Sequence, residues 1–97
     1  MTYEKTQLLY QSSFDLVLEF CEIDEARWEV RKVEVFADGS MTWADESTPL
    51  DAKTRLSDQR TPKMEHMKPD PELITELITP EAFEEIWRAA RSGEKWK

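Results

Sequence analysis

The chain has 97 residues, of which 39% are hydrophobic, and its 21 acidic and 13 basic side chains give a net charge of -8. A chain of this length has enough apolar residues for one core, so we expect a single domain over residues 1–97. The charge disfavours direct binding to nucleic acid or to a membrane surface, whose phosphates repel an acidic protein, and favours a basic or phosphate-binding protein surface as the partner.

Two antiparallel strands are predicted near the amino terminus. Residues 6–10 and 15–23 are rich in Leu, Val, Phe and Tyr, and the polar run 11–13 between them is typical of a hairpin loop. Around the second segment, apolar side chains recur at every second position and therefore share one face. This face, the best core candidate, consists of Phe14, Leu16, Leu18 and Phe20.

Cys21, the only cysteine, lies in the second strand segment. It cannot form an internal disulfide, and its apolar neighbours favour a packed thiol over a nucleophile. The amino-terminal residues show no secretion signal, and no segment approaches the roughly 20 apolar residues that cross a bilayer. We therefore expect a cytoplasmic protein.

Two further strands are predicted at 28–37 and 41–44. Val30 and Val33 fall on opposite faces of a regular strand, so we expect a bulge near Arg31-Lys32 to restore the alternation. Asp38-Gly39 predicts a type I′ turn between these strands, because that turn needs positive φ at both central residues.

Residues 46–70 predict a long, partly irregular loop, since they contain three prolines, many charges and little periodicity. A short helical turn is expected near 51–56. The stretch 51–68 is locally basic, so we expect it to lie over the acidic sheet rather than to contact a partner.

Helix starts are predicted at Asp70-Pro71 and Thr79-Pro80, where a capping side chain precedes proline at the first helical position. In the second helix the apolar residues have helical spacing, and Ser92-Gly93 supplies the stop. The apolar stripe consists of Phe83, Ile86, Trp87 and Ala90. The fold class that follows is α+β: a four-stranded antiparallel meander with a C-terminal amphipathic helix packed on one face.

His66 is the only histidine, and its neighbours offer neither a second metal ligand nor a nucleophile to activate. An exposed loop residue is the favoured interpretation, and a small enzyme using His66 is the less favoured one. The two glycines, Gly39 and Gly93, both have turn or cap roles, so no phosphate loop is expected. We expect no catalytic residue, no cofactor and no metal.

The chain contains four tryptophans, a number that also suits base stacking or an aromatic cage. Trp28, Trp43 and Trp87 lie on predicted strand and helix faces, which favours core packing, while Trp96 lies in the tail. Stacking platforms for nucleic acid combine aromatic rings with basic surface, and this sheet is acidic.

Acidic residues concentrate in the first half, where residues 1–50 contain eleven acids and four bases. A meander brings the turn at 24–25 and the strand end at 45–46 to the same end of the sheet. The candidate partner-binding rim is therefore Glu22, Asp24, Glu25, Asp45 and Glu46, with Glu4 alongside. Such a rim steers a basic partner electrostatically; the alternative is a solvated edge that prevents pairing with other chains.

The run from Glu22 to Gly39, with its central Arg-Trp-Glu-Val-Arg-Lys-Val-Glu element, and the downstream run from Ile78 to Ala90 resemble a family of small bacterial domains of unknown function. The resemblance implies a bacterial or phage setting and a compact sheet-plus-helix fold, and it assigns no catalytic residue.

Within that element basic and acidic side chains alternate. Two interpretations stay open: a charged recognition face, or a ladder of cross-strand ion pairs with Glu19 and Glu22. The residues concerned are Arg27, Glu29, Arg31, Lys32 and Glu34.

The sequence thus favours a non-enzymatic acidic protein-binding module, monomeric, that inhibits or modulates a partner, as an immunity protein or a phage-borne anti-defence inhibitor does. The alternative is a nucleic-acid mimic that occupies a phosphate-binding groove.

Overall fold

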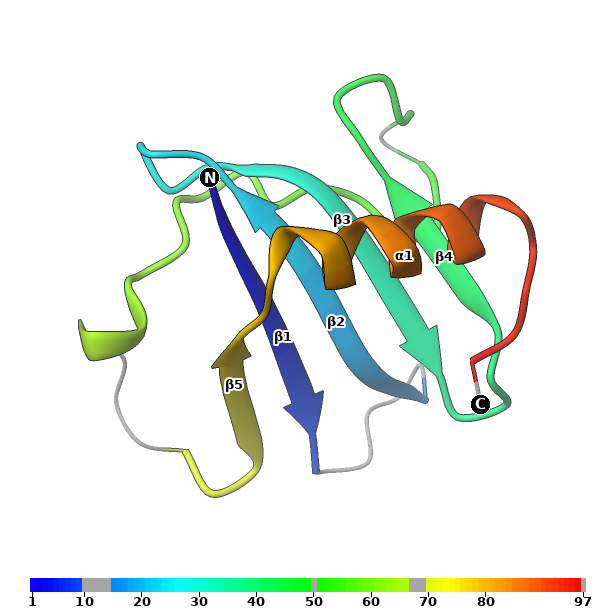
Figure 1. Ribbon diagram of the computed structural model, residues 1–97, viewed down its shortest axis with the longest axis horizontal. Coiled ribbons are helices and arrows are strands. Elements are labelled where there is room, and N and C mark those ends of the chain that lie inside the picture. Colours follow the sequence, from blue (N-terminus) through cyan, green and yellow to red (C-terminus); the bar gives the residue numbers. More distant parts are fainter. Residues whose placement is uncertain (10–14, 50, 67–69, 97) are drawn as a thin grey trace.

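The computed structural model describes residues 1–9, 15–49, 51–66 and 70–96. The elements are β1 (Thr2–Leu8), β2 (Leu16–Ile23), β3 (Glu29–Phe36), β4 (Met41–Ala44), the 3-10 helix η1 (Met64–His66), β5 (Leu73–Leu77) and α1 (Pro80–Arg91) (Figure 1). The strands form one antiparallel sheet in the order β4-β3-β2-β1-β5, and α1 crosses one of its faces. The α+β class is confirmed, but the sheet has five strands rather than four.

The additional strand is β5, in the segment that the sequence predicts as the first of two helices. The carboxylate of Asp70 accepts a hydrogen bond from the Glu72 amide at 2.8 Å, as an N-cap does, but the chain then turns and extends along β1. Thr75 lies opposite Thr6, and the two hydroxyls are 3.0 Å apart. Pairing with an open sheet edge thus overrides a local helix signal that only two residues carry.

The predicted core face of β2 is partly confirmed. Leu18 and Phe20 are buried against α1, and Phe14 lies outside the described residues. A bulge at Val17 shifts the register, so that Leu16 pairs with Phe36 and lines the opposite face of the sheet. One residue inserted into the strand reverses the side to which Leu16 points.

The predicted bulge in β3 lies one residue earlier than expected, at Val30, where Glu22 pairs with Arg31 and Ile23 with Glu29. The expected type I′ turn at Asp38-Gly39 is wrong, because only Gly39 has a positive φ, of 87°. Hydrogen bonds from Gly39 N to Phe36 O, at 2.8 Å, and from Phe36 N to Ser40 O, at 2.9 Å, instead close a three-residue loop.

Helix α1 begins and ends as predicted. The Thr79 hydroxyl accepts a hydrogen bond from the Ala82 amide at 3.1 Å, Pro80 occupies the first turn, and Gly93 follows in the left-handed conformation. The predicted apolar stripe of Phe83, Ile86, Trp87 and Ala90 is buried. Tyr3 lies 5.3 Å from Phe83 between ring centroids, and Trp43 lies at the same distance from Trp87.

Trp28 does not pack in the core, contrary to expectation. It is exposed at the start of β3, and the guanidinium of Arg60 lies 5.4 Å from its ring centroid. The turn between β2 and β3 places Trp28 beyond the part of the sheet that α1 covers.

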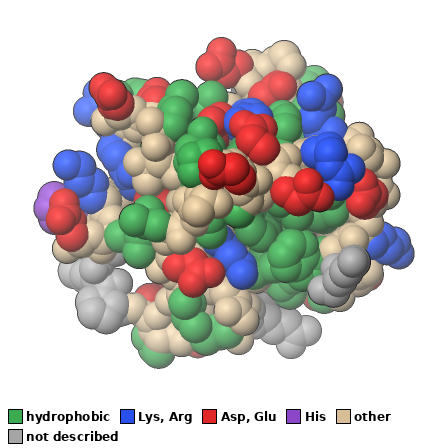
Figure 2. Space-filling model, in the orientation of Figure 1, with side chains coloured by type: hydrophobic (Ala, Val, Ile, Leu, Met, Phe, Trp, Pro, Cys, Tyr) green, Lys and Arg blue, Asp and Glu red, His purple; other side chains and the backbone are tan. Residues whose placement is uncertain are grey.

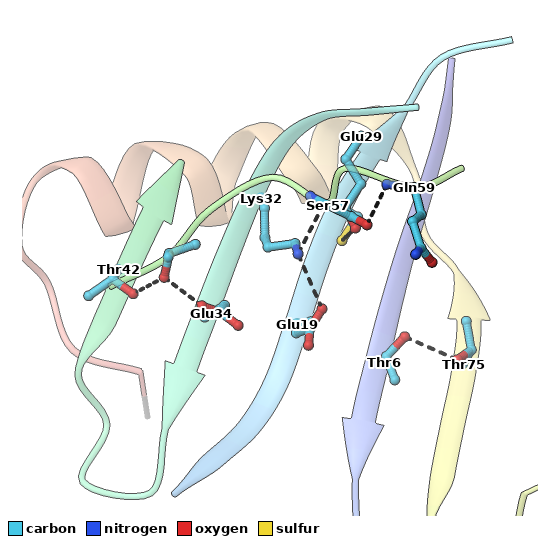
Figure 3. Close-up of polar contacts among 11 residues, drawn as sticks. Thr6, Glu19, Glu29, Lys32, Glu34, Thr42, Ser57, Gln59 and Thr75 are labelled. Carbon is cyan, nitrogen blue, oxygen red and sulfur yellow. Dashed lines mark hydrogen bonds and ion pairs between the residues drawn. The ribbon is translucent and has the colours of Figure 1, made fainter. Parts of the chain in front are cut away.

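The loop after β4 lies against the sheet face away from α1, where Figure 3 shows it in front of the strands. Thr54 is fully buried there, donates a hydrogen bond to the Glu34 carboxylate at 2.6 Å and contacts the Thr42 hydroxyl. Residues 51–54 form a turn and bends and 55–56 are irregular, so the expected helical turn near 51–56 is wrong. The basic loop and the acidic strands thus form one polar layer.

Candidate partner-binding site

An apolar groove opens on the face that carries α1. The helix crosses the sheet towards one end, and Figure 2 shows hydrophobic side chains gathered below it. The groove has a volume of about 550 Å³ and is lined by Lys5, Phe20, Met41, Glu76, Ile78, Ala82, Glu85, Ile86, Ala89, Glu94, Lys95 and Trp96. Grooves with apolar linings and a few polar groups at the mouth are typical of binding sites.

Three parts of the fold form the walls of this groove. Phe20 and Met41 contribute from the sheet, and the short side chains of Ala82 and Ala89 leave the helix wall recessed. The third wall is Trp96, whose ring centroid lies 5.6 Å from that of Phe20 and whose amide donates to Gly39 O at 2.8 Å. The tail is therefore fixed to the β3–β4 turn and closes one side of the groove.

Charged side chains surround the mouth of the groove. Lys5 on β1 pairs with Glu76 on β5 at 3.7 Å, and Arg88 of α1 pairs with Glu85 at 2.8 Å and with Glu94 at 2.7 Å. Lys5 is half-buried and the other groups are exposed, so the pairs contribute little to stability. They leave a polar rim around an apolar floor.

Four residues of the predicted acidic rim lie in two turns, one between β2 and β3 and the other directly after β4. Asp24 accepts the amide of Trp28 at 2.9 Å, and Asp45 accepts both the amide and the hydroxyl of Ser47, which lowers the pKa of the Asp45 carboxyl. Glu25 and Glu46 are exposed. The two aspartates hold their own turns, so the two glutamates are the carboxylates of this set that extend into solvent.

The fifth residue of the predicted rim, Glu22, is only 6% exposed and faces α1. Its carboxylate accepts hydrogen bonds from Arg31 Nε at 2.6 Å, from Arg31 Nη2 at 2.9 Å and from the Tyr3 hydroxyl at 2.8 Å. These bonds lower the pKa of Glu22, with the Arg31 guanidinium the largest cause. Glu4, also buried, pairs with Arg27 at 2.9 Å.

The charges on the face away from α1 pair with one another. Lys32, 8% exposed, lies 2.9 Å from Glu29 and 3.9 Å from Glu19, and the Ser57 amide donates to Glu29 at 2.6 Å (Figure 3). The Cys21 thiol lies 3.9 Å from Glu29, and burial raises its pKa well above the usual range. These contacts favour the ion-pair ladder over an exposed recognition face, and they make Cys21 a packed thiol.

His66 is exposed in η1 and does not line the groove. Within the ranges that the structure describes, no group of three His, Cys, Asp or Glu side chains is arranged to hold a metal ion. Among the same residues, no helix is long and apolar enough to span a membrane.

Sequence reasoning missed the groove, although it placed Ile86 correctly on the buried stripe of α1. Ala82 and Ala89 are seven residues apart on α1, next to the buried stripe, and two alanines at that spacing are the one signal that a recess adjoins the helix. The contribution of Trp96 follows from its contact with Gly39, and nothing local in the sequence indicates it.

The fold and the groove define a small α+β protein with one helix on an open antiparallel sheet and an apolar recess between the two. The chain belongs to the family described as Domain of unknown function (DUF6881), which matches residues 3–92. The resemblance to a family of small domains of unknown function is thereby confirmed. No curated protein and no solved structure matches the chain.

Proposed function

We propose that the chain is a non-enzymatic protein-binding module whose groove between α1 and the sheet receives an apolar side chain of a basic partner. The groove carries this proposal, because it joins an apolar floor of Phe20 and Met41 to a mouth of charged residues. Interfaces commonly anchor on one or two apolar side chains in such a recess, with a polar rim that excludes water.

The charge of the chain supports a basic partner. At -8 the protein attracts positively charged surfaces over several ångströms, and the exposed carboxylates of Glu25 and Glu46 extend this field at one end of the sheet. Long-range attraction of this kind raises the association rate more than the affinity. The acidic end would therefore steer the partner, and the groove would hold it.

Binding of this kind inhibits or modulates the partner by covering its surface. We propose that the protein acts in the cytoplasm of a bacterium, as an immunity protein or a phage-borne inhibitor of a host defence would. The free thiol of Cys21 supports a reducing compartment such as the cytoplasm.

Nucleic-acid mimicry is the weaker alternative. A mimic needs free carboxylates at phosphate-like spacing, whereas Glu4 and Glu22 are neutralised by Arg27 and Arg31. An enzyme using His66 is weaker still, since this side chain lies outside the groove.

Affinity capture from a bacterial host lysate with two matched variants tests the proposal. Ala89→Leu fills the groove from a helix position that tolerates leucine, and Ala26→Leu makes the same change in the exposed turn beside Glu25. We expect wild-type protein and Ala26→Leu to retain one stoichiometric partner, and Ala89→Leu to lose it. Equal recovery by Ala89→Leu, or recovery of no stoichiometric partner at low and moderate salt, would contradict the proposal.

A further inference from the structure

The outer edge of β5 has a row of backbone groups that point away from the sheet. Glu72 O accepts from Leu9 N at 2.7 Å, and Ile78 N donates to Tyr3 O at 2.9 Å, so both residues face β1. Hydrogen-bonding direction alternates along a strand. The backbone N–H and C=O groups of Leu73, Thr75 and Leu77 therefore point outward. Among the residues that the structure describes, the Leu73 amide alone of these three has a further partner, Asp70 O at 3.2 Å.

Within the described part of the chain, this edge has few of the features that usually protect an edge strand. Charged residues, proline, bulges or a covering segment commonly block the addition of another strand. The segment 73–77 contains no proline and no Lys or Arg, and its regular pairing with β1 has no bulge. Its single acid, Glu76, pairs with Lys5, while Ile74 and Leu77 are 49% and 64% exposed.

We infer that β5 binds an extended, basic segment of the partner protein as a sixth strand of the sheet. Backbone hydrogen bonds to Thr75 and Leu77 would give affinity, and the exposed Ile74 and Leu77 would contact alternate side chains of the added strand. This inference rests on the proposed function, because it describes how the same partner is bound.

Charge identifies the occupant as basic. Residues 70–79 contain three acids and no basic residue, so an added strand with Lys or Arg at alternate positions meets opposite charge. A second copy of this chain would bring the same three acids together and oppose two molecules of charge -8. The edge therefore suits another protein better than a copy of itself.

The edge and the groove adjoin each other. Glu76 lies in β5 and Ile78 directly follows it, and both residues also line the groove. A segment paired with β5 thus runs along the groove mouth, from where the next part of the partner can place an apolar side chain on Met41 and Trp96.

A defined peptide tests the strand addition without knowledge of the natural partner. The probe is an alternating Lys-Val peptide of about ten residues, long enough to cover the edge, titrated onto the isotopically labelled full chain and observed by NMR. We expect the amides of Thr75 and Leu77 to shift and their hydrogen exchange to slow by about fivefold or more, while those of Ile74 and Glu76, already directed at β1, change less. An alternating Glu-Val peptide should bind at least about tenfold more weakly.

Backbone changes distinguish strand pairing from simple charge attraction. Two versions of the peptide are methylated at every second backbone nitrogen, one at the odd and one at the even positions. Only one of these two sets of amides faces β5, so one version should lose binding and the other should keep it. Thr75→Pro removes an outward amide and leaves the β1-facing residues unchanged, so this variant should bind the Lys-Val peptide at least about tenfold more weakly. Thr75→Val keeps the amide and should bind the peptide as the wild type does.

The possible results separate this inference from the proposed function. Shifts at Met41 and the Trp96 indole without shifts in β5 would overturn strand addition and leave groove binding intact. Equal loss of binding by the two methylated peptides, or no peptide binding at all, would also overturn strand addition. Groove binding is tested separately, by the affinity capture with Ala89→Leu. Slowing of Thr75 exchange with protein concentration alone would assign the edge to self-association instead.

Discussion

The guanidinium of Arg31 joins the sheet to α1 by holding two carboxylates from different elements. It donates to Glu22 on the neighbouring strand through Nε and Nη2, and to Glu84 on the helix at 3.0 and 2.7 Å. Its central carbon also lies 4.9 Å from the ring centroid of Phe83 and 5.1 Å from that of Trp87. Arg31 thus fixes the position of the helix that forms one wall of the groove.

Replacing Glu22 by Gln should lower the free energy of unfolding by about 2 kcal/mol, because Arg31 loses the more buried of its two carboxylate partners and keeps only the exposed Glu84. The control is Glu25→Gln, an exposed site where the change should stay below about 0.5 kcal/mol. Urea denaturation of both variants measures the difference. Equal effects of the two substitutions would show that the Glu22–Arg31 pair is not structurally important.

Acid should remove the contribution of Glu22. Because its pKa in the folded chain is lower than the ordinary 4.5, this stabilisation is fully present above pH 4.5 and is lost as the pH falls through the folded value. Burial raises the pKa of Glu19, so protonation of Glu19 partly offsets the loss in the wild type. The clean measurement is therefore the stability difference between wild type and Glu22→Gln, which should shrink below pH 4.5. A difference that stays constant down to pH 3 would contradict it.

The contact between the tail and the β3–β4 turn can be tested with the two glycines. A Cβ at Gly39 would lie 3.0 Å from Trp96 O, whereas a Cβ at Gly93 would meet nothing within 4 Å, and both residues have positive φ. Gly93→Ala should therefore lower the free energy of unfolding by about 1 kcal/mol, the cost of placing alanine at a positive φ. Gly39→Ala adds the clash with Trp96 O and should lower it by about 2 kcal/mol or more. Gly39→Ala should also shift the Trp96 indole resonance. Identical effects would mean that the tail does not pack on the turn.

Removing the hydroxyl of Thr54 should loosen the loop that covers the second face. Thr54→Val leaves Glu34 and Thr42 without their buried partner and should cost about 1–3 kcal/mol. Limited proteolysis should then cleave within 51–62 faster than in the wild type. Thr61→Val is the control, because Thr61 contacts Arg27 through its carbonyl. No increase in cleavage for Thr54→Val relative to this control would exclude the anchoring role.

The sequence predicts those parts of the fold whose signals are local and repeated. Helix α1 has a cap, a proline, a four-residue stripe and a terminal glycine, and all of them agree with the structure. Strand β5 is not predictable from its own segment, because Asp70-Pro71 has the pattern of a helix start, while the pairing of β5 depends on β1, more than sixty residues earlier in the chain.

The candidate site is less predictable for the same reason. Glu22 has the same parity as Phe20 and therefore points to the side of α1, but its partner depends on the register between β2 and β3, which sets Phe20 opposite Val33 and Glu22 opposite Arg31. The groove depends on the angle at which α1 crosses the sheet and on a tail contact at Gly39, neither of which is encoded in any single segment.

The most direct test of the central claim is the methyl NMR spectrum of the chain when the captured partner is added. Ala89 and Met41 report on the groove, and Ala26 reports on the acidic end of the sheet. We predict that the methyl resonances of Ala89 and Met41 shift on binding and that the Ala26 methyl changes little. A shift of Ala26 with Ala89 and Met41 unchanged would show that the partner binds the acidic end and that the groove is not the site.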